Sequence, residues 1–192
     1  MKILNKIIIL LFLGLSFNSF SQLSKTTPFV DWTTADGSQQ VYKQNCMVHN
    51  PNGNGYTYVA GANYLNGYYD LMVTKIDEDG AIVWSRTYGS SNSGDDAASA
   101  IFVDNNEDVY VCGTTFIDST NFNDFDLIKY QSNGTLDWDA TYNADGSYYD
   151  GAIDMVYDED NQFIYVVGTG FNDNLDLDFI TLQYDPAGNL QW

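Results

Sequence analysis

Three residues could support nucleophilic or metal chemistry, Cys46, His49 and Cys112. A Ser-His-Asp or Cys-His arrangement would have to use His49, which is the only histidine. His49 stands beside the loop NPNGNG and is interpreted as a loop or strand-end residue. One histidine and two cysteines are also too few for the usual zinc ligand sets. The sequence therefore predicts no catalytic residue and no cofactor-binding residue.

Carboxylates offer two further chemistries. The acidic turns DNNED and DEDNQ make Asp104, Asp108, Asp158 and Asp160 weak candidates for calcium ligands, although these turns lack the long loop of an EF-hand. Turns rich in Asp and Asn also arise for conformational reasons alone. Two carboxylates could meet for glycoside cleavage in so acidic a chain, but no carboxylate departs from its repeat as a catalytic residue would.

The elements that position these residues repeat along the chain. The segments DEDGAIVW, QSNGTLDW and DPAGNLQW each end in Gly-x-x-x-Trp, and they recur at equal intervals. YTYVAG, DVYVCG and FIYVVG match one another, and DDAASAIFVD matches YDGAIDMVYD. The units end near Trp84, Trp138 and Trp192, and the N-terminal strand around Trp32 matches the end of another unit.

The alternation of apolar and polar residues in one unit predicts four strands, at residues 97–104, 109–116, 124–131 and 135–142. Four short antiparallel strands with turns between them are typical of a propeller blade. The predicted fold is an all-β β-propeller of four-stranded blades, with about three blades in residues 22–192. Because propellers usually need at least four blades, missing C-terminal blades or another chain are expected to close the ring.

The repeated Gly-x-x-x-Trp has a structural interpretation. A tryptophan at the same place in each blade can cover the seam between neighbouring sheets. The glycine is predicted to adopt positive φ in a turn, capped by the preceding Asp. A ligand platform is the alternative interpretation of the tryptophans.

The N-terminus predicts export. Lys2 and Lys6 precede a short apolar run from Ile7 to Leu15, so residues 1–21 are interpreted as a signal peptide, with a retained anchor as the alternative. Its removal leaves five basic against 26 acidic residues, a net charge of −21. This charge disfavours nucleic acid and anionic membranes as partners. The expected location is secreted or at the cell surface, without membrane insertion after cleavage.

The cysteines have two open interpretations. An exported setting would permit a disulfide between Cys46 and Cys112. Both residues lie in apolar β-type stretches, NCMVH and DVYVCG, which favours buried free thiols.

The combination D-x-A-x-x-I-x-V-D, VYVxG, DFxxxKYxxxG and a final W resembles the bacterial SBBP-type β-propeller repeat of exported Bacteroidetes-like proteins, over residues 29–192. D-x-x-G-x-x-x-W also resembles the tryptophan-docking repeat of quinoprotein dehydrogenases and of the outer-membrane assembly lipoprotein. That repeat usually carries Asp-x-x-Thr-Gly, whereas these turns read Glu-Asp-Gly, Ser-Asn-Gly and Pro-Ala-Gly. The first resemblance is favoured, and no quinone cofactor is predicted.

These observations predict a non-enzymatic interaction or structural module with a protein or glycan ligand. The alternative is the propeller part of an extracellular polysaccharide-active hydrolase or lyase. Its site would lie at the channel mouth, formed by loops such as 62–69 and 116–123.

Overall fold

The computed structural model describes residues 46–50, 55–65, 67–89, 94–118, 122–144, 148–172, 174 and 176–192. The predicted signal peptide, residues 1–21, and the strand around Trp32 lie outside these residues.

The described residues form eleven β-strands and no helix. Their β-branched and aromatic residues alternate between the two faces of pleated sheets, and turns rich in Asp, Asn and Gly separate them. The strands are β1 (Cys46–His49), β2 (Thr57–Leu65), β3 (Tyr68–Ile76), β4 (Ile82–Tyr88), β5 (Ala97–Val103), β6 (Val109–Asp118), β7 (Phe122–Tyr130), β8 (Leu136–Tyr142), β9 (Gly151–Asp158), β10 (Phe163–Phe171) and β11 (Leu177–Tyr184).

The strands form three antiparallel sheets, each made of strands consecutive in the chain. The first sheet is β1–β4, the second is β5–β8 and the third is β9–β11. Where the third sheet would have its fourth strand, the single bridge between Tyr184 and Leu190 occupies the place of the pair Tyr130–Leu136 in the second sheet. The all-β prediction is therefore confirmed, and so are the four strands per unit in the first two sheets, while no sheet in the described part of the chain closes into a ring.

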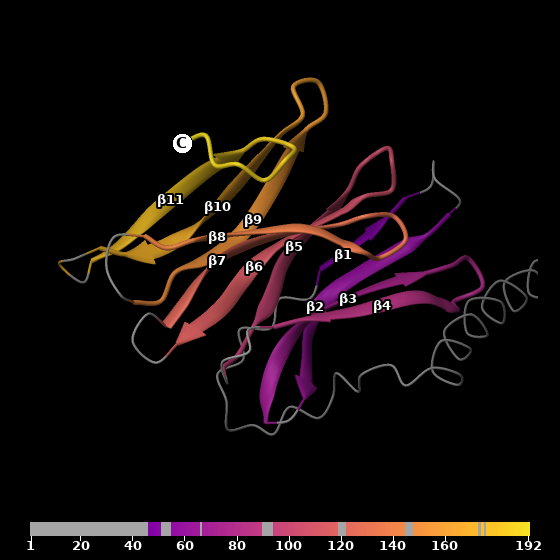
Figure 1. Ribbon diagram of the computed structural model, residues 1–192, viewed down its shortest axis with the longest axis horizontal. Coiled ribbons are helices and arrows are strands. Elements are labelled where there is room, and N and C mark those ends of the chain that lie inside the picture. Colours follow the sequence, from indigo (N-terminus) through magenta and orange to yellow (C-terminus); the bar gives the residue numbers. More distant parts are fainter. Residues whose placement is uncertain are drawn as a thin grey trace, which may run out of the picture.

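The sheets stack in chain order (Figure 1). Strand β5 packs against β1, β2 and β3, and β9 packs against β5, β6 and β7. We call the side of a sheet that points toward the preceding sheet its leading face, and the opposite side its trailing face. Small residues on the first strands, such as Ala98 and Ala152, permit this close approach.

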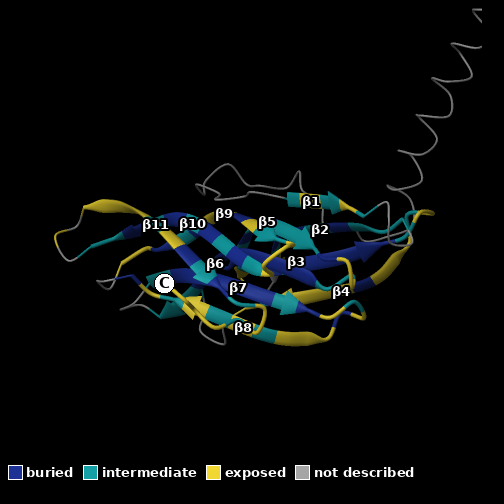
Figure 2. Ribbon diagram, turned by 90° about the horizontal axis from the view of Figure 1, so that it is seen from above, coloured by how far each residue is buried: buried dark blue, intermediate teal, exposed yellow. Residues whose placement is uncertain are grey.

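Two apolar clusters hold the stack together, one at each junction between sheets. At the first junction, Leu71 and Val73 of the first sheet meet Val111 and Ile128 of the second. At the second junction, the cluster joins the second and third sheets through the residues Tyr110, Cys112, Phe125, Leu127, Ala152, Met155, Ile164, Val166, Leu182 and Tyr184. The central strand β7 is therefore buried on both of its faces, as Figure 2 shows.

Both cysteines are free thiols, as the apolar stretches predicted. Cys112 is fully buried and Cys46 is half-buried. Burial raises the pKa of Cys46 to about 11, and it raises the pKa of Cys112 as well. Neither thiol is therefore activated for nucleophilic chemistry.

Candidate functional site

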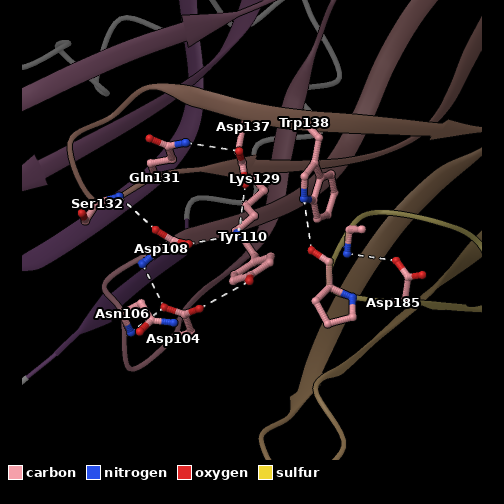
Figure 3. Close-up of polar contacts among 12 residues, drawn as sticks. Asp104, Asn106, Asp108, Tyr110, Lys129, Gln131, Ser132, Asp137, Trp138 and Asp185 are labelled. Carbon is pink, nitrogen blue, oxygen red and sulfur yellow. Dashed lines mark hydrogen bonds and ion pairs between the residues drawn. The ribbon is translucent and has the colours of Figure 1, made fainter.

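The repeated tryptophans connect one sheet to the next. Trp84 of β4 donates from Nε1 to the carbonyl oxygen of Ser132, 3.1 Å away in the β7–β8 turn. Trp138 of β8 repeats the contact with the carbonyl oxygen of Pro186 at 3.2 Å (Figure 3). Each indole thus crosses to the matching turn of the following unit. The tryptophans therefore cover the seams, as predicted.

The repeated glycines lie in turns, and two of them contact the docked indoles. Gly80, Gly134 and Gly188 have φ of 80°, 79° and 82°, in the region that favours glycine. A Cβ on Gly134 would lie 2.8 Å from the Trp84 ring, and one on Gly188 would lie 2.8 Å from the Trp138 ring. Glycine is thus required at both positions by backbone conformation and by the docked indole.

A tyrosine accompanies each tryptophan at the same place in every sheet. The ring centroids of Tyr58 and Trp84 are 6.3 Å apart, and those of Tyr110 and Trp138 are 6.2 Å apart. Tyr165 and Trp192 repeat this pair at 6.3 Å in the third sheet. In the two covered sheets the Trp–Tyr pair is a packing unit, since the following sheet closes over it.

Two lysines, Lys75 buried and Lys129 half-buried, neutralise carboxylates beside the docked indoles. Lys129 lies 3.0 Å from Asp108 and 3.1 Å from Asp137 (Figure 3). Burial alone would lower the pKa of Lys129, but its hydrogen bonds to these two carboxylates outweigh that effect and raise the pKa. In the first sheet Lys75 lies 2.8 Å from Glu107 of the next sheet. Of these pairs, only Lys75–Glu107 crosses a junction, and it is needed there because a buried lysine without a partner would be costly.

The calcium candidates already accept hydrogen bonds within turns. Asp104 Oδ1 accepts from the amides of Asn106 and Asp108, as Figure 3 shows. Asp108 also accepts from the amide of Ser132 at 3.1 Å. Asp158 Oδ1 accepts from the amides of Asp160 and Asn161. Among the described residues no three His, Cys, Asp or Glu gather as metal ligands, and calcium binding stays a prediction.

At the opposite ends of the strands, two repeated aspartates cap their sheets. Asp96 Oδ1 accepts from Thr115 Oγ1 at 2.8 Å and from the Phe116 amide at 2.7 Å. Asp150, at the same place in the next unit, accepts from the amides of Ala144 and Phe171 at 2.7 and 3.0 Å. These buried carboxylates satisfy backbone donors and hold the hairpin ends in place.

An aromatic group at this same end departs from the repeat. Phe122 stacks on Tyr148, with centroids 6.4 Å apart and planes at 6°, and it lies 5.0 Å from Tyr149. Phe171 lies 6.2 Å from Tyr148. Phe122 has φ of 56°, a conformation that non-glycine residues rarely adopt. Tyr148 and Tyr149 are 39% and 57% exposed, so their rings are available to a ligand.

An open hollow of about 350 Å³ lies beside this group. It runs between the end of β8 and strands β10 and β11, and Phe171 belongs both to the hollow and to the aromatic group. Asn172 donates from Nδ2 to Asp178 at 2.8 Å on its wall. The lining residues are Tyr142, Ala144, Gly170, Phe171, Asn172, Asp178, Phe179 and Ile180.

Two buried carboxylates near this end have oxygens without hydrogen-bond partners. Burial and the neighbouring Asp150 raise the pKa of Asp124 to about 6, and its Oδ1 has no partner. Burial, with Asp139 and Asp96 nearby, raises the pKa of Asp126 to about 8. Neither oxygen of Asp126 has a partner, and burial without partners favours the neutral form of this carboxyl group.

His49 ends β1, as the sequence predicted, and its Nδ1 lies 3.1 Å from Thr57 Oγ1. Of the aromatic group, only Phe122 was included in the prediction, within the loop 116–123 of the alternative enzyme site. A signal existed, because Tyr148 and Tyr149 occupy the places of Gly94 and Asp95 in the previous unit.

No protein-family model matches the chain, and no curated protein gives a significant match to it. None of the described residues forms a helix long and apolar enough to cross a bilayer.

Proposed function

We propose that this chain is an exported, non-enzymatic interaction module with a β-propeller architecture, resembling the SBBP-type repeat proteins. Stacked four-stranded units with a tryptophan at each seam support this architecture. In this proposal the regular ends of the sheets form the scaffold, and the ends that carry the aromatic group bind the ligand.

The observation that carries this proposal is the exposed aromatic group beside the hollow. Rings such as those of Tyr148 and Tyr149 can stack on the apolar faces of sugar rings. Asp178 and Asn172 on the adjoining wall can exchange hydrogen bonds with hydroxyl groups. The acidic charge of the chain disfavours an anionic ligand. We therefore favour a neutral glycan at the cell surface or outside the cell.

A glycan array read with purified protein tests this binding. Tyr149→Ala should abolish binding without changing the thermal unfolding midpoint, because the ring is more than half exposed. Tyr64→Ala is the matched control, since Tyr64 is 59% exposed at the corresponding end of the first sheet. Equal loss of binding in both variants, or no binding to any glycan, would contradict the proposal.

A second candidate is a polysaccharide-active hydrolase or lyase. It is favoured by Asp124, whose raised pKa of about 6 suits a general acid. Asp150 lies near enough to contribute to this shift. Incubation with a polysaccharide panel, read as release of reducing ends or unsaturated products, separates the two candidates. Turnover that Asp124→Asn abolishes, without stable glycan binding, would favour the enzyme.

A further inference from the structure

The trailing face of the third sheet exposes apolar residues that the other sheets bury. Phe179 is 75% exposed and Trp192 is 58% exposed. Cross-strand pairing places Val156 beside Tyr165, Val167 beside Thr181, and Thr169 beside Phe179. We call this surface the open face, and its residues are Val156, Tyr165, Val167, Phe179, Thr181 and Trp192.

The corresponding residues of the other two sheets are covered. Leu71 and Phe125 hold the place of Phe179 in the first and second sheets, and each is 1% exposed. Trp84, at the place of Trp192, is 6% exposed. The open face therefore continues a series of two interfaces that the chain itself displays.

We propose that the open face binds a further β-sheet unit of this same repeat. The two existing junctions define the chemistry of that partner. Phe125 lies against Gly168, where a Cβ would stand 2.6 Å from its ring, so the partner needs glycine opposite Phe179. Phe102 stacks on Tyr157 at 4.8 Å, so the partner needs an aromatic or β-branched residue opposite Val156.

Trp192 sets the third requirement. Trp84 and Trp138 each give their indole N–H to a carbonyl oxygen in a turn that contains a positive-φ glycine. The partner must offer such a turn, because any side chain on that glycine would collide with the ring. A general hydrophobic ligand would satisfy the apolar area but not this donor.

A second copy of the chain does not offer the required surface. The leading faces of the second and third sheets are occupied within the stack. On the first sheet, Thr74 and Ile76 hold the places of the leading-face residues Ile128 and Tyr130, and they are only 4% and 6% exposed. The partner is therefore a unit with a free leading face, in a longer stack of the same repeat.

The test appends a copy of residues 139–192 directly after Trp192, which continues the repeat in register. Hydrogen exchange of the original β11, Leu177–Tyr184, is measured with and without the copy. We expect the copy to slow exchange in β11 and to raise the urea midpoint. Phe179→Ala should leave the midpoint of the original chain nearly unchanged and lower that of the extended chain clearly.

The matched control carries Gly188→Val in the appended copy only. This change should remove much of the added protection, because it closes the place where the Trp192 indole would lie. Unchanged exchange in β11, or an appended copy that itself stays unprotected, would overturn the proposal. The same effect of Phe179→Ala in both chains would overturn it as well.

Discussion

Both junctions between sheets bury apolar residues, and one buried polar position is among their differences. At the first junction the second sheet presents Asp126, whose carboxylate is 1% exposed and lacks hydrogen-bond partners. At the second junction Ile180 stands at the same place in the third sheet and packs against the apolar cluster. The repeat thus fixes how the sheets pack, and we expect Asp126 to make the first junction sensitive to pH.

Removal of the indoles is the strongest test of how the two junctions and the exposed third sheet differ. Trp84→Ala should lower the free energy of unfolding by about 3–5 kcal/mol, since the ring is almost fully buried. Trp138→Ala should cost less because its ring is only partly buried. Trp192→Ala should change stability by no more than about 0.5 kcal/mol. Urea unfolding measures all three, and an equal cost at Trp84 and Trp192 would contradict the assignment of their roles.

Asp126→Asn should remove a pH dependence that belongs to the first junction. The folded protein holds the neutral acid with a pKa of about 8, against 3.8 for an ordinary aspartate. At a pH between these two pKa values, unfolding releases a proton from Asp126. The free energy of unfolding therefore falls as the pH rises, by at most about 1.4 kcal/mol per pH unit. From pH 5 to pH 7, Asp126→Asn should gain up to about 3 kcal/mol relative to the unaltered chain, measured by urea unfolding at each pH.

The reciprocal change tests whether position alone confers this behaviour. Ile180→Asp places a carboxylate at the matching site of the second junction. Urea unfolding across this pH range should show a steeper negative slope in that variant than in the unaltered chain, because two buried carboxyl groups then contribute. A slope equal to that of the unaltered chain would show that Ile180 and Asp126 are not equivalent.

A smaller loss of stability is expected at Arg86, which belongs to the first junction. Its Nε donates to the Gly134 carbonyl at 2.7 Å, and its guanidinium lies 5.7 Å from the Trp84 ring. Ala140 stands at the matching place beside the second junction. Arg86→Ala should lower the free energy of unfolding by about 0.5–1.5 kcal/mol, measured in urea. Arg86→Lys as control should also lose stability, because lysine lacks the Nε donor.

The sequence predicted the strands and the packing role of Gly-x-x-x-Trp well. Both follow from short patterns, since alternation marks a strand and a glycine after polar residues marks a turn. It could not predict that Trp84 would dock on the turn at Ser132, because that partner lies in another unit. The direction of docking depends on how two sheets stack.

Apart from Phe122 in the predicted loop 116–123, the aromatic group was not predicted, for a different physical reason. Phe122, Tyr148 and Phe171 come from three separate segments, and only the stacking of the second and third sheets brings their rings together. The strained backbone at Phe122 has no local sequence signal either, because its φ of 56° is imposed by the surrounding structure. Asp126 likewise looks like any polar strand residue until the first sheet covers it.

The two apolar clusters each join sheets that are neighbours in the chain. The stability of such a stack is approximately the sum of the intrinsic stability of each repeat unit and the interaction energy of each pair of neighbouring units. The second sheet has two neighbours, while the third has one in the described structure. We therefore expect the free energy of local opening to rise from the third sheet toward β7.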